Sequence, residues 1–478
     1  MSAVRERFIS FWSTAGPHLL PFADVATPDL PLGRLLRLSL FQVSVGMALV
    51  LLVGTLNRVM IVELDVPASL VGAMIALPLV FAPFRALIGF KSDNHRSALG
   101  WRRVPYIWKG SLAQFGGFSI MPFALLVLAG EGQSDVLPGW VGQMAAASAF
   151  LLVGAGVHTI QTAGLALATD LTPQESHPKV VGLMYVMLLL GMMASALVFG
   201  AVLADYSPGR LVRVIQTVAL LTLVLNVIAV WKQEPRRRAS VAEVEAPDPS
   251  FMDAWRTFAE GKHTLRRLAI VGLGTMAFGM ADILLEPFGG HVLSLSVGTT
   301  TTLTALFAAG GLVGFGLASK FISDGVEPYT AARWGAVLGL PAFALVILAA
   351  PMKFTALFVA GNFLIGLGGA LFAHGTLTAA MRRAPAEQVG LALGSWGAMQ
   401  ATAAGLGVAL SGALRDVVNA VGSAGTVNTA SAQGYLTVYG LEIVLLIVTI
   451  IAITPMLRAS RLEHSEMTLD SQTPAPSA

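Results

Sequence analysis

Two carboxylates stand one helical turn apart in the stretch ADILLEPFGG, Ala281–Gly290, which is otherwise almost wholly apolar. Residues four apart share one face of a helix, so Asp282 and Glu286 should project in the same direction. An ionisable side chain inside an apolar membrane segment is costly and marks a functional site by default. Such a pair can bind a ligand, act as a gate, couple protons or form a structural ion pair.

A proline follows directly after the second acid and should interrupt the helix. Pro287 has no N–H to donate to the helical ladder, and Gly289 and Gly290 follow it. We therefore expect the helix to break just after Glu286, in the outer half of the membrane. A broken helix beside two carboxylates suggests a binding or gating site near the periplasmic mouth.

Arg58 is the expected partner of the two acids. It lies in GTLNRVMI, a stretch that aligns with GMADILLE, so that Asn57 corresponds to Asp282. A similar depth on a symmetry-related helix would bring the guanidinium to the carboxylates. Two interpretations stay open: a polar cluster that gates or couples protons, and a salt bridge that only fixes two helix bundles.

The remaining polar side chains within the apolar segments are few, and two of them are histidines. The candidates for a cavity or ligand site are Asn57, Arg58, Glu63, His158, Gln161, Asp282, Glu286 and His374, while Glu442 lies in the last apolar segment. A neutral imidazole can bind a metal, including the magnesium of a chlorin ring, or hydrogen-bond a ring carbonyl. His158 and His374 are thus possible axial ligands, although a hydrogen bond between helices is the plainer interpretation.

Composition and motifs exclude most enzymatic chemistry. The chain has no cysteine, which removes disulfides, thiol nucleophiles and Cys-ligated metal centres. The sequence contains no phosphate loop, dinucleotide fingerprint, metal-spaced cluster or Ser/His/Asp signal. We expect neither an enzyme nor a resident metal or other cofactor, and no nucleic-acid partner.

The elements that must position these residues are membrane helices. Hydrophobic residues make up 55% of the 478 residues and charged residues only 12%, against roughly 25% charged in a soluble domain. Runs of about 20 apolar residues, enough to cross ~30 Å of hydrocarbon, occur twelve times. The predicted spans are 38–62, 67–89, 104–128, 140–168, 180–204, 211–230, 268–292, 299–322, 331–350, 355–381, 389–414 and 435–456.

Six spans precede a polar insert and six follow it, which predicts an all-α membrane protein with twelve transmembrane helices in two six-helix bundles. The predicted units are a cytoplasmic N-terminal segment with an interfacial helix (1–37), the first bundle (38–230), a cytoplasmic linker (231–267), the second bundle (268–456) and a cytoplasmic tail (457–478). Most Lys and Arg residues fall on the side of the linker and both termini, which the positive-inside rule makes cytoplasmic. This arrangement resembles the major facilitator superfamily, whose halves are parallel repeats.

Equivalent helices of the two halves end in the same Ser-Asp pair, Ser92–Asp93 and Ser323–Asp324. The first of these loops resembles the superfamily's cytoplasmic signature of Gly, Asp, Gly and paired Arg. The candidates for a gating loop are Gly89, Asp93, Arg102, Arg103 and Asp324. A carboxylate at a helix end can hold a neighbouring helix through arginine in one conformation and release it in another, whereas the alternative is an ordinary solvated loop. Small-residue patterns at Gly310–Gly314 and Gly154–Gly156 predict close helix packing.

Long stretches of the chain resemble one branch of the superfamily. These stretches are LPLGRLLRLSLFQVSVGMALVLLVGTLNRVMIVEL, FAPFRALIGFKSDNHRSALGWRRVPYIWKG, GLALATDLTPQESHPKVVGLMYVMLLLGM and DILLEPFGG. From about Leu19 to Met456 the chain is similar to the bacteriochlorophyll delivery family, the PucC/LhaA group of light-harvesting complex assembly factors of purple phototrophic bacteria.

The resemblance implies a multi-pass protein of the bacterial inner, intracytoplasmic photosynthetic membrane that helps to assemble light-harvesting complex 1 or 2 (LH1 or LH2). It implies bacteriochlorophyll a as cargo, delivered to the antenna apoproteins or held during their assembly. The implied partners are light-harvesting antenna polypeptides, the reaction-centre core, pigment-synthesis enzymes and membrane lipid. Two alternatives stay open: a proton-coupled secondary transporter of a small solute, and a ligand-free assembly scaffold.

Overall fold

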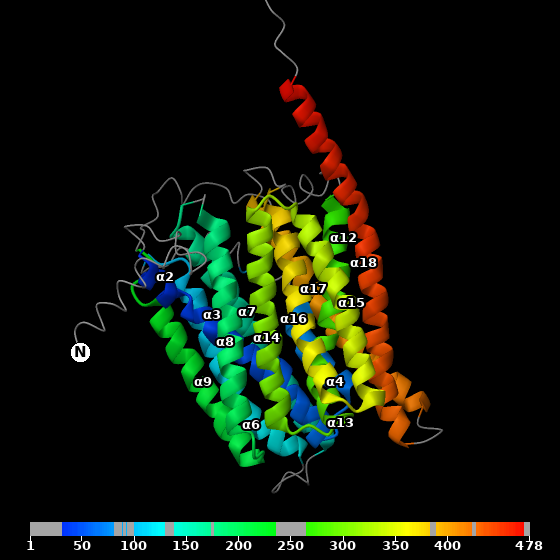
Figure 1. Cartoon of the computed structure of the whole chain (residues 1–478). Helices are drawn as coiled ribbons and strands as arrows, with labels where there is room; N and C mark the ends of the chain where they lie inside the picture. Colours follow the sequence, from blue (N-terminus) through cyan, green and yellow to red (C-terminus); the bar gives the residue numbers. More distant parts are fainter. Residues whose placement is uncertain are drawn as a thin grey trace, which may run out of the picture.

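Apolar helices make up most of the chain and run roughly side by side (Figure 1). The computed structural model describes residues 31–80, 88, 92, 100–129, 138–173, 176–235, 264–382, 389–422 and 427–472. Within these residues, eleven helices are long and apolar enough to cross a membrane, and a shorter apolar helix begins at Ala68. The prediction of an all-α membrane protein is confirmed.

The first bundle is built from the helices that precede residue 235. Its elements are α2 (Leu32–Leu38), α3 (Leu40–Leu49), two π-helical segments (Val50–Leu56 and Val59–Glu63), α4 (Ala68–Val80), α6 (Val104–Leu128), α7 (Gly139–Asp170), α8 (His177–Val202) and α9 (Pro208–Val230). The elements from α2 to the second π-helical segment form one continuous span. Because α3 packs against α7, α8 and α9, this first span lies at the centre of its bundle.

The second bundle begins at Thr264 and repeats this arrangement. Its elements are α12 (Thr264–Gly279), a 3₁₀ turn (Ala281–Ile283), α13 (Leu285–His291), α14 (Val297–Ser323), α15 (Pro328–Met352), α16 (Thr355–Arg382), α17 (Val389–Gly422) and α18 (Val427–Gln472). Here α12 packs against α16, α17 and α18. The two bundles meet along two helix pairs, α4 with α17 and α8 with α14.

Three predicted segments compare with these bounds as follows. The expected interfacial helix before residue 31 lies outside the described residues, and so does most of the linker, 236–263. The predicted tail after residue 456 continues α18 as a helix to Gln472, which projects beyond the other helices (Figure 1).

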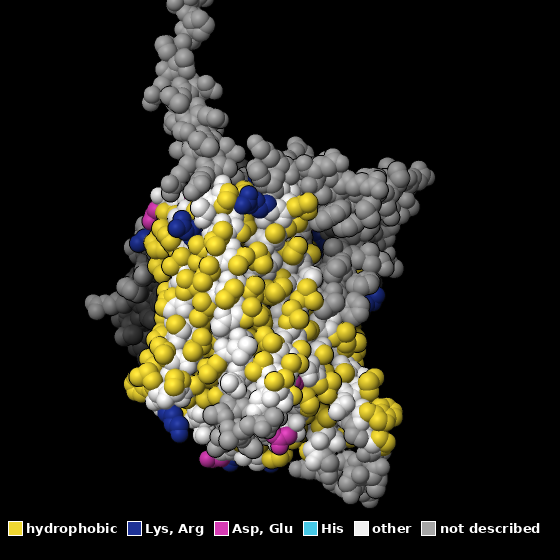
Figure 2. All heavy atoms as spheres, turned by 90° about the vertical axis from the view of Figure 1, so that its right-hand side faces the viewer, with side chains coloured by type: hydrophobic (Ala, Val, Ile, Leu, Met, Phe, Trp, Pro, Cys, Tyr) yellow, Lys and Arg dark blue, Asp and Glu magenta, His cyan; other side chains and the backbone are white. Residues whose placement is uncertain are grey.

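The surface is divided in the way that a membrane protein requires. In Figure 2 the charged side chains gather toward the two ends of the helices, and hydrophobic side chains cover the zone between them. Large apolar side chains of the membrane helices are well exposed, among them Phe123 on α6, at 70%, and Ile451 on α18, at 65%. Exposure of this kind is stable only when lipid takes the place of water.

Glycines set the distance between several helix pairs. A Cβ atom on Gly110 of α6 would lie 2.9 Å from the carbonyl oxygen of Gly156 on α7. On α14, a Cβ at Gly314 would meet the carbonyl group of Leu367 on α16. A Cβ at Gly310 would also meet the backbone of α16. The predicted close packing at these small residues is confirmed, because backbone atoms occupy the space that a side chain would need.

Two glycines two residues apart on α14 test this explanation. We expect Gly314→Ala to lower the free energy of unfolding by about 1–3 kcal/mol, because overpacking against a backbone cannot be relieved by a rotamer change. A Cβ added at Gly316 would have no atom within 4 Å, so Gly316→Ala should not lower the free energy of unfolding. Thermal unfolding of both variants in one detergent measures the difference, and equal stability would contradict the packing argument.

Candidate functional site

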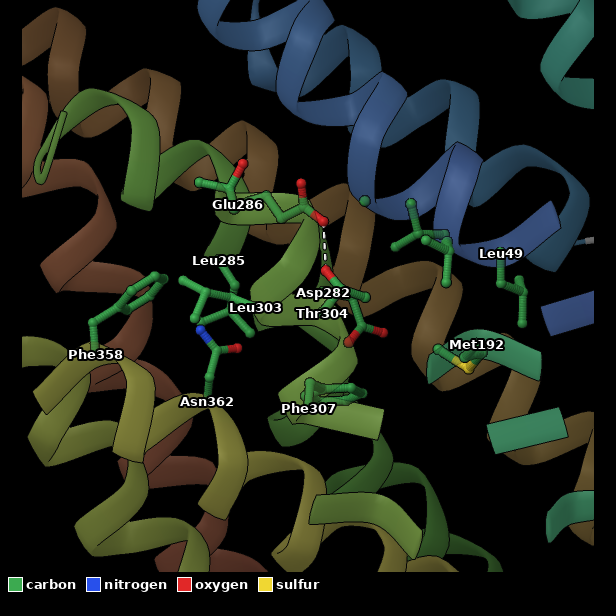
Figure 3. Close-up of a pocket in the computed structure, with 14 residues that line it drawn as sticks. Leu49, Met192, Asp282, Leu285, Glu286, Leu303, Thr304, Phe307, Phe358 and Asn362 are labelled. Atoms are coloured by element: carbon green, nitrogen blue, oxygen red, sulfur yellow. Dashed lines mark hydrogen bonds between the residues drawn. The ribbon is translucent and has the colours of Figure 1, made fainter. Parts of the chain in front are cut away.

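A cavity of about 210 Å³ lies between the two bundles and contains both predicted acids (Figure 3). The first bundle contributes residues from α3, the following π-helical segment and α8, and the second contributes residues from α13, α14, α16 and the turn before α13. The lining residues are Leu49, Val50, Val53, Gly54, Met192, Asp282, Leu285, Glu286, Thr300, Leu303, Thr304, Phe307, Phe358 and Asn362. Most are apolar, so the few polar groups decide what the cavity can bind.

Glu286 is held by hydroxyl groups. Thr304 Oγ1 donates a hydrogen bond to its carboxylate (Figure 3), and Thr301 Oγ1 donates a second at 3.5 Å. Thr301 also shares a 3.3 Å hydrogen bond with Thr55 of the first bundle. Any side chain on Gly54 would collide with the carboxylate, so this glycine makes room for Glu286 between the bundles.

Asp282 differs from Glu286 in its contacts. It lies in the 3₁₀ turn before α13 and borders the cavity. Its carboxylate makes no hydrogen bond or ion pair with the residues that the structure describes, whereas Glu286 is only 6% exposed and hydrogen-bonded. The carboxylate of Asp282 is therefore available to a proton or a bound solute. The carboxylate of Glu286 already accepts hydrogen bonds from threonines of the protein.

The helix break lies before Glu286, not after it as predicted. α12 ends at Gly279, and α13, which contains both Glu286 and Pro287, begins at Leu285. A proline inside a helix leaves the carbonyl group four residues earlier without its donor, and its ring pushes that carbonyl away. For Pro287 this is the carbonyl of Ile283, so the irregular winding falls one turn upstream. We call Met280–Leu284, where a 3₁₀ turn replaces the α-helical hydrogen bonding, the unwound segment.

Asn57 supplies the missing donor from the other bundle. Its Nδ2 donates to the carbonyl oxygen of Ile283 at 2.7 Å and to that of Val53, on its own helix, at 2.9 Å. Asn57 is fully buried. The residue predicted as a cavity candidate thus connects the first span to the unwound segment, next to the cavity rather than in its wall.

The predicted ion pair between Arg58 and the two acids is wrong. Arg58 Nη1 instead lies 2.9 Å from Glu63 Oε1, and Nη2 donates to the carbonyl of Leu295 at 3.2 Å. The chain between Arg58 and Glu63 is π-helical, and i→i+5 winding brings residues five apart onto neighbouring positions. The guanidinium also lies against Gly290, so Arg58 and Glu63 close the end of the bundle interface beside the end of α13.

The two candidate histidines and Gln161 do not line the cavity. His158 and Gln161 are half-buried on α7. His374 on α16 is half-buried and packs against Phe315 of α14, with 4.2 Å between the ring centroids. Any ligand bound by these imidazoles would occupy a different place from the cavity between the bundles.

Of the gating candidates, Arg102 and Arg103 lie where α6 begins, while Gly89 and Asp93 fall outside the described residues. Arg103 Nε contacts Asp170, at the end of α7, at 3.0 Å, and Arg103 Nη1 donates to Ser92 at 2.6 Å. Arg102 reaches the same Asp170 at 3.5 Å. Thus an arginine does hold a carboxylate at a helix end, but the carboxylate within the described residues is Asp170.

A second acid that the sequence analysis missed caps the start of α6. The carboxylate of Glu234, just after α9, accepts hydrogen bonds from the backbone N–H groups of Arg102, Arg103 and Val104 at 2.7–3.1 Å. A carboxylate on free N–H groups at a helix start stabilises that helix. In the second half, Asp324 follows the last residue of α14 and forms no ion pair within the described part of the chain.

Removing the Asn57 amide tests the connection to the unwound segment. We expect Asn57→Ala to lower the free energy of unfolding by about 1–3 kcal/mol, because the buried carbonyl of Ile283 loses its donor. Ser119→Ala is the matched control, since that exposed hydroxyl bonds only to its own helix, at Phe115. Thermal unfolding in detergent measures both, and a neutral Asn57→Ala would contradict this role.

Comparison with known proteins agrees with the fold and identifies the family. A family model described as PUCC protein matches residues 55–461. Protein PucC of Rhodovulum sulfidophilum is 60% identical over 420 residues, which cover 87% of this chain and 92% of the relative. The "Bacteriochlorophyll synthase 44.5 kDa chain" of Rhodobacter capsulatus is 29% identical over 78% of this chain and 85% of its own length.

Among solved structures, the chain resembles a bacterial homologue of the human lysosomal transporter Spinster in an inward-facing and unoccupied conformation. The TM-score is 0.65 at 14% identity, over 89% of this chain and 97% of the transporter. At this identity the likeness concerns the fold alone, and it confirms the major facilitator superfamily architecture. The sequence matches go further: this multi-pass membrane protein belongs to the PucC family.

Proposed function

We propose that this protein is an assembly factor for a light-harvesting complex, LH1 or LH2, in a purple phototrophic bacterium. In this proposal it binds bacteriochlorophyll a in the intracytoplasmic photosynthetic membrane and delivers it to the antenna polypeptides. Pigment-synthesis enzymes supply the cargo, and the reaction-centre core lies beside the growing antenna. Membership of the PucC family carries the proposal, and the name of the Rhodobacter capsulatus relative, which refers to bacteriochlorophyll synthase, supports the link to this pigment.

The size of the cavity limits where such a pigment can bind. Sites that enclose a drug-sized ligand measure roughly 300–1,000 Å³, whereas this cavity measures about 210 Å³. A chlorin with its long tail is larger than most drug-sized ligands and does not fit in this conformation. We therefore place the pigment outside the cavity, on the lipid-facing surface of the helices, with both termini on the cytoplasmic side.

His158 and His374 are the candidate axial ligands in this proposal. Both are half-buried within membrane helices, so part of each side chain is accessible outside the cavity between the bundles. A neutral imidazole supplies one nitrogen to the magnesium of the ring. The apolar exposed side chains around the bundles offer the hydrophobic contact area that the rest of the pigment needs.

The absorption spectrum of the protein purified in mild detergent from a pigment-producing host tests the function. We expect stoichiometric bacteriochlorophyll, a loss of several-fold in His158→Phe or His374→Phe, and no loss in the Asp282→Asn/Glu286→Gln double variant, which alters only the cavity. Loss of pigment in the double variant would indicate that the pigment binds in the cavity. Absence of pigment from every sample, with antenna subunits still copurifying, would identify a ligand-free scaffold.

A second candidate function is proton-coupled transport of a small solute. The observation that favours it is the carboxylate of Asp282, which borders a solute-sized cavity between the bundles and is not used by any hydrogen bond within the described residues. In reconstituted vesicles, an entrapped pH-sensitive dye would report proton entry when pools of sugars, amino acids or nucleosides are added. Transport predicts entry that disappears in Asp282→Asn; no entry with any pool rejects it.

A further inference from the structure

Asn362 of α16 brings an unused amide group to the cavity between the bundles. The residue is only 4% exposed and belongs to the cavity wall, and in Figure 3 its amide group points from α16 into the cavity. No hydrogen bond joins this amide to any residue that the structure describes. Buried polar groups are almost always hydrogen-bonded, so the amide of Asn362 needs a partner inside the cavity.

The carboxylate of Asp282 is the second unused polar group on the same wall. It makes no hydrogen bond or ion pair within the described part of the chain. The other polar side chains of the wall are engaged, since Thr300 donates to backbone carbonyls of its own helix and Thr304 donates to Glu286. Asp282 and Asn362 are therefore the two groups left for a bound molecule.

The wall contains two acids and no basic side chain. Asp282 and Glu286 line the cavity, and no Lys, Arg or His occurs among the described residues that line it. Arg58, the cation expected beside these acids, pairs with Glu63 instead. Opposite charges attract each other more strongly in apolar surroundings than in water, so this cavity favours a cation and rejects an anion.

The rest of the wall indicates which kind of cation fits. Within the described residues no group of three or more His, Cys, Asp or Glu could hold a metal ion. Most lining residues are apolar and can cover carbon atoms, and Phe307 and Phe358 add aromatic rings, whose faces attract cations (Figure 3). The volume of about 210 Å³ lies below the roughly 300–1,000 Å³ of sites for drug-sized ligands. These features suit a small organic cation.

We propose that the cavity binds a small primary ammonium ion. Its N–H groups donate to the carboxylate of Asp282 and to the side-chain carbonyl of Asn362, and its carbon atoms lie against the apolar wall. A neutral alcohol lacks the charge, and a quaternary ammonium ion lacks the N–H donors. The inference does not rest on pigment delivery, because we place the pigment outside the cavity. If the transport candidate holds, this ion is its solute, but binding requires no transport.

Titration calorimetry of the purified full-length protein in mild detergent tests the proposal, with butylamine as the probe at neutral pH. We expect butylamine to bind at one site. We expect 1-butanol and tetramethylammonium to bind about tenfold more weakly or not at all, because each loses a charge-assisted hydrogen bond. Titration into detergent without protein gives the background heat.

Two variants locate the site. We expect Asp282→Asn and Asn362→Leu, which keep the approximate shape of each side chain, to weaken butylamine binding about tenfold and several-fold. Asp205→Asn is the matched control, because it removes a carboxylate that is 90% exposed and pairs with Arg210. Its affinity should equal that of the unaltered protein. Thermal unfolding in the same detergent shows which variants are folded, and either cavity variant alone can locate the site.

Three results would overturn the proposal. Unchanged affinity in a folded cavity variant would place butylamine elsewhere. Tighter binding of sodium than of butylamine would identify a site for an inorganic cation. Absence of binding by butylamine would mean that water alone satisfies Asp282 and Asn362. None of these results bears on pigment delivery, which the absorption spectrum tests separately.

Discussion

One backbone carbonyl, that of Ile283, connects the helix break to the packing of the two bundles. In lipid there is no water to satisfy a carbonyl that has lost its donor, so the protein must provide one. Pro287 creates this need and Asn57, on the central span of the other bundle, meets it. Because the donor and the acceptor belong to different bundles, satisfying the backbone also fixes how the bundles meet beside the cavity.

The two cavity acids acquire different roles from this arrangement. The threonines of α14 and the space left by Gly54 hold Glu286 in place. Asp282 lies in the 3₁₀ turn before α13, and its carboxylate faces the cavity. A small cavity with one free acid suits a proton or a small polar group better than a large ring, which supports our proposal that pigment binds on the lipid-facing surface of the helices.

The two ends of the first bundle are closed by different contacts. At the end beside α13, Arg58 and Glu63 pair across one π-helical segment, and Arg58 reaches the second bundle through the carbonyl of Leu295. At the opposite end, Asp170 pairs with Arg103, and Glu234 accepts hydrogen bonds from the start of α6. Both contacts lie inside the first bundle. A change of conformation that separates the bundles at the end beside α13 must therefore break the Arg58 contact with Leu295.

The sequence by itself determined the membrane class, the helices, the family and the unusual character of Asp282 and Glu286. These follow from composition, from the length of apolar runs and from long matching stretches, and none of them requires knowledge of which helices meet. Packing at Gly314 could be predicted for the same reason, since a small residue on a membrane helix serves close approach wherever its partner lies.

Only the tertiary structure decided which groups pair with one another. Arg58 reaches the second bundle at Gly290 and Leu295, and local π-helical winding directs it to Glu63. Winding of this kind leaves no clear pattern in the sequence. Thr301, Thr304 and Glu234 are ordinary residue types whose roles arise from partners on other helices. The sequence predicts the break one turn too late because a proline removes the donor of the carbonyl group four residues earlier. The replacement donor for this carbonyl comes from a residue 226 positions away.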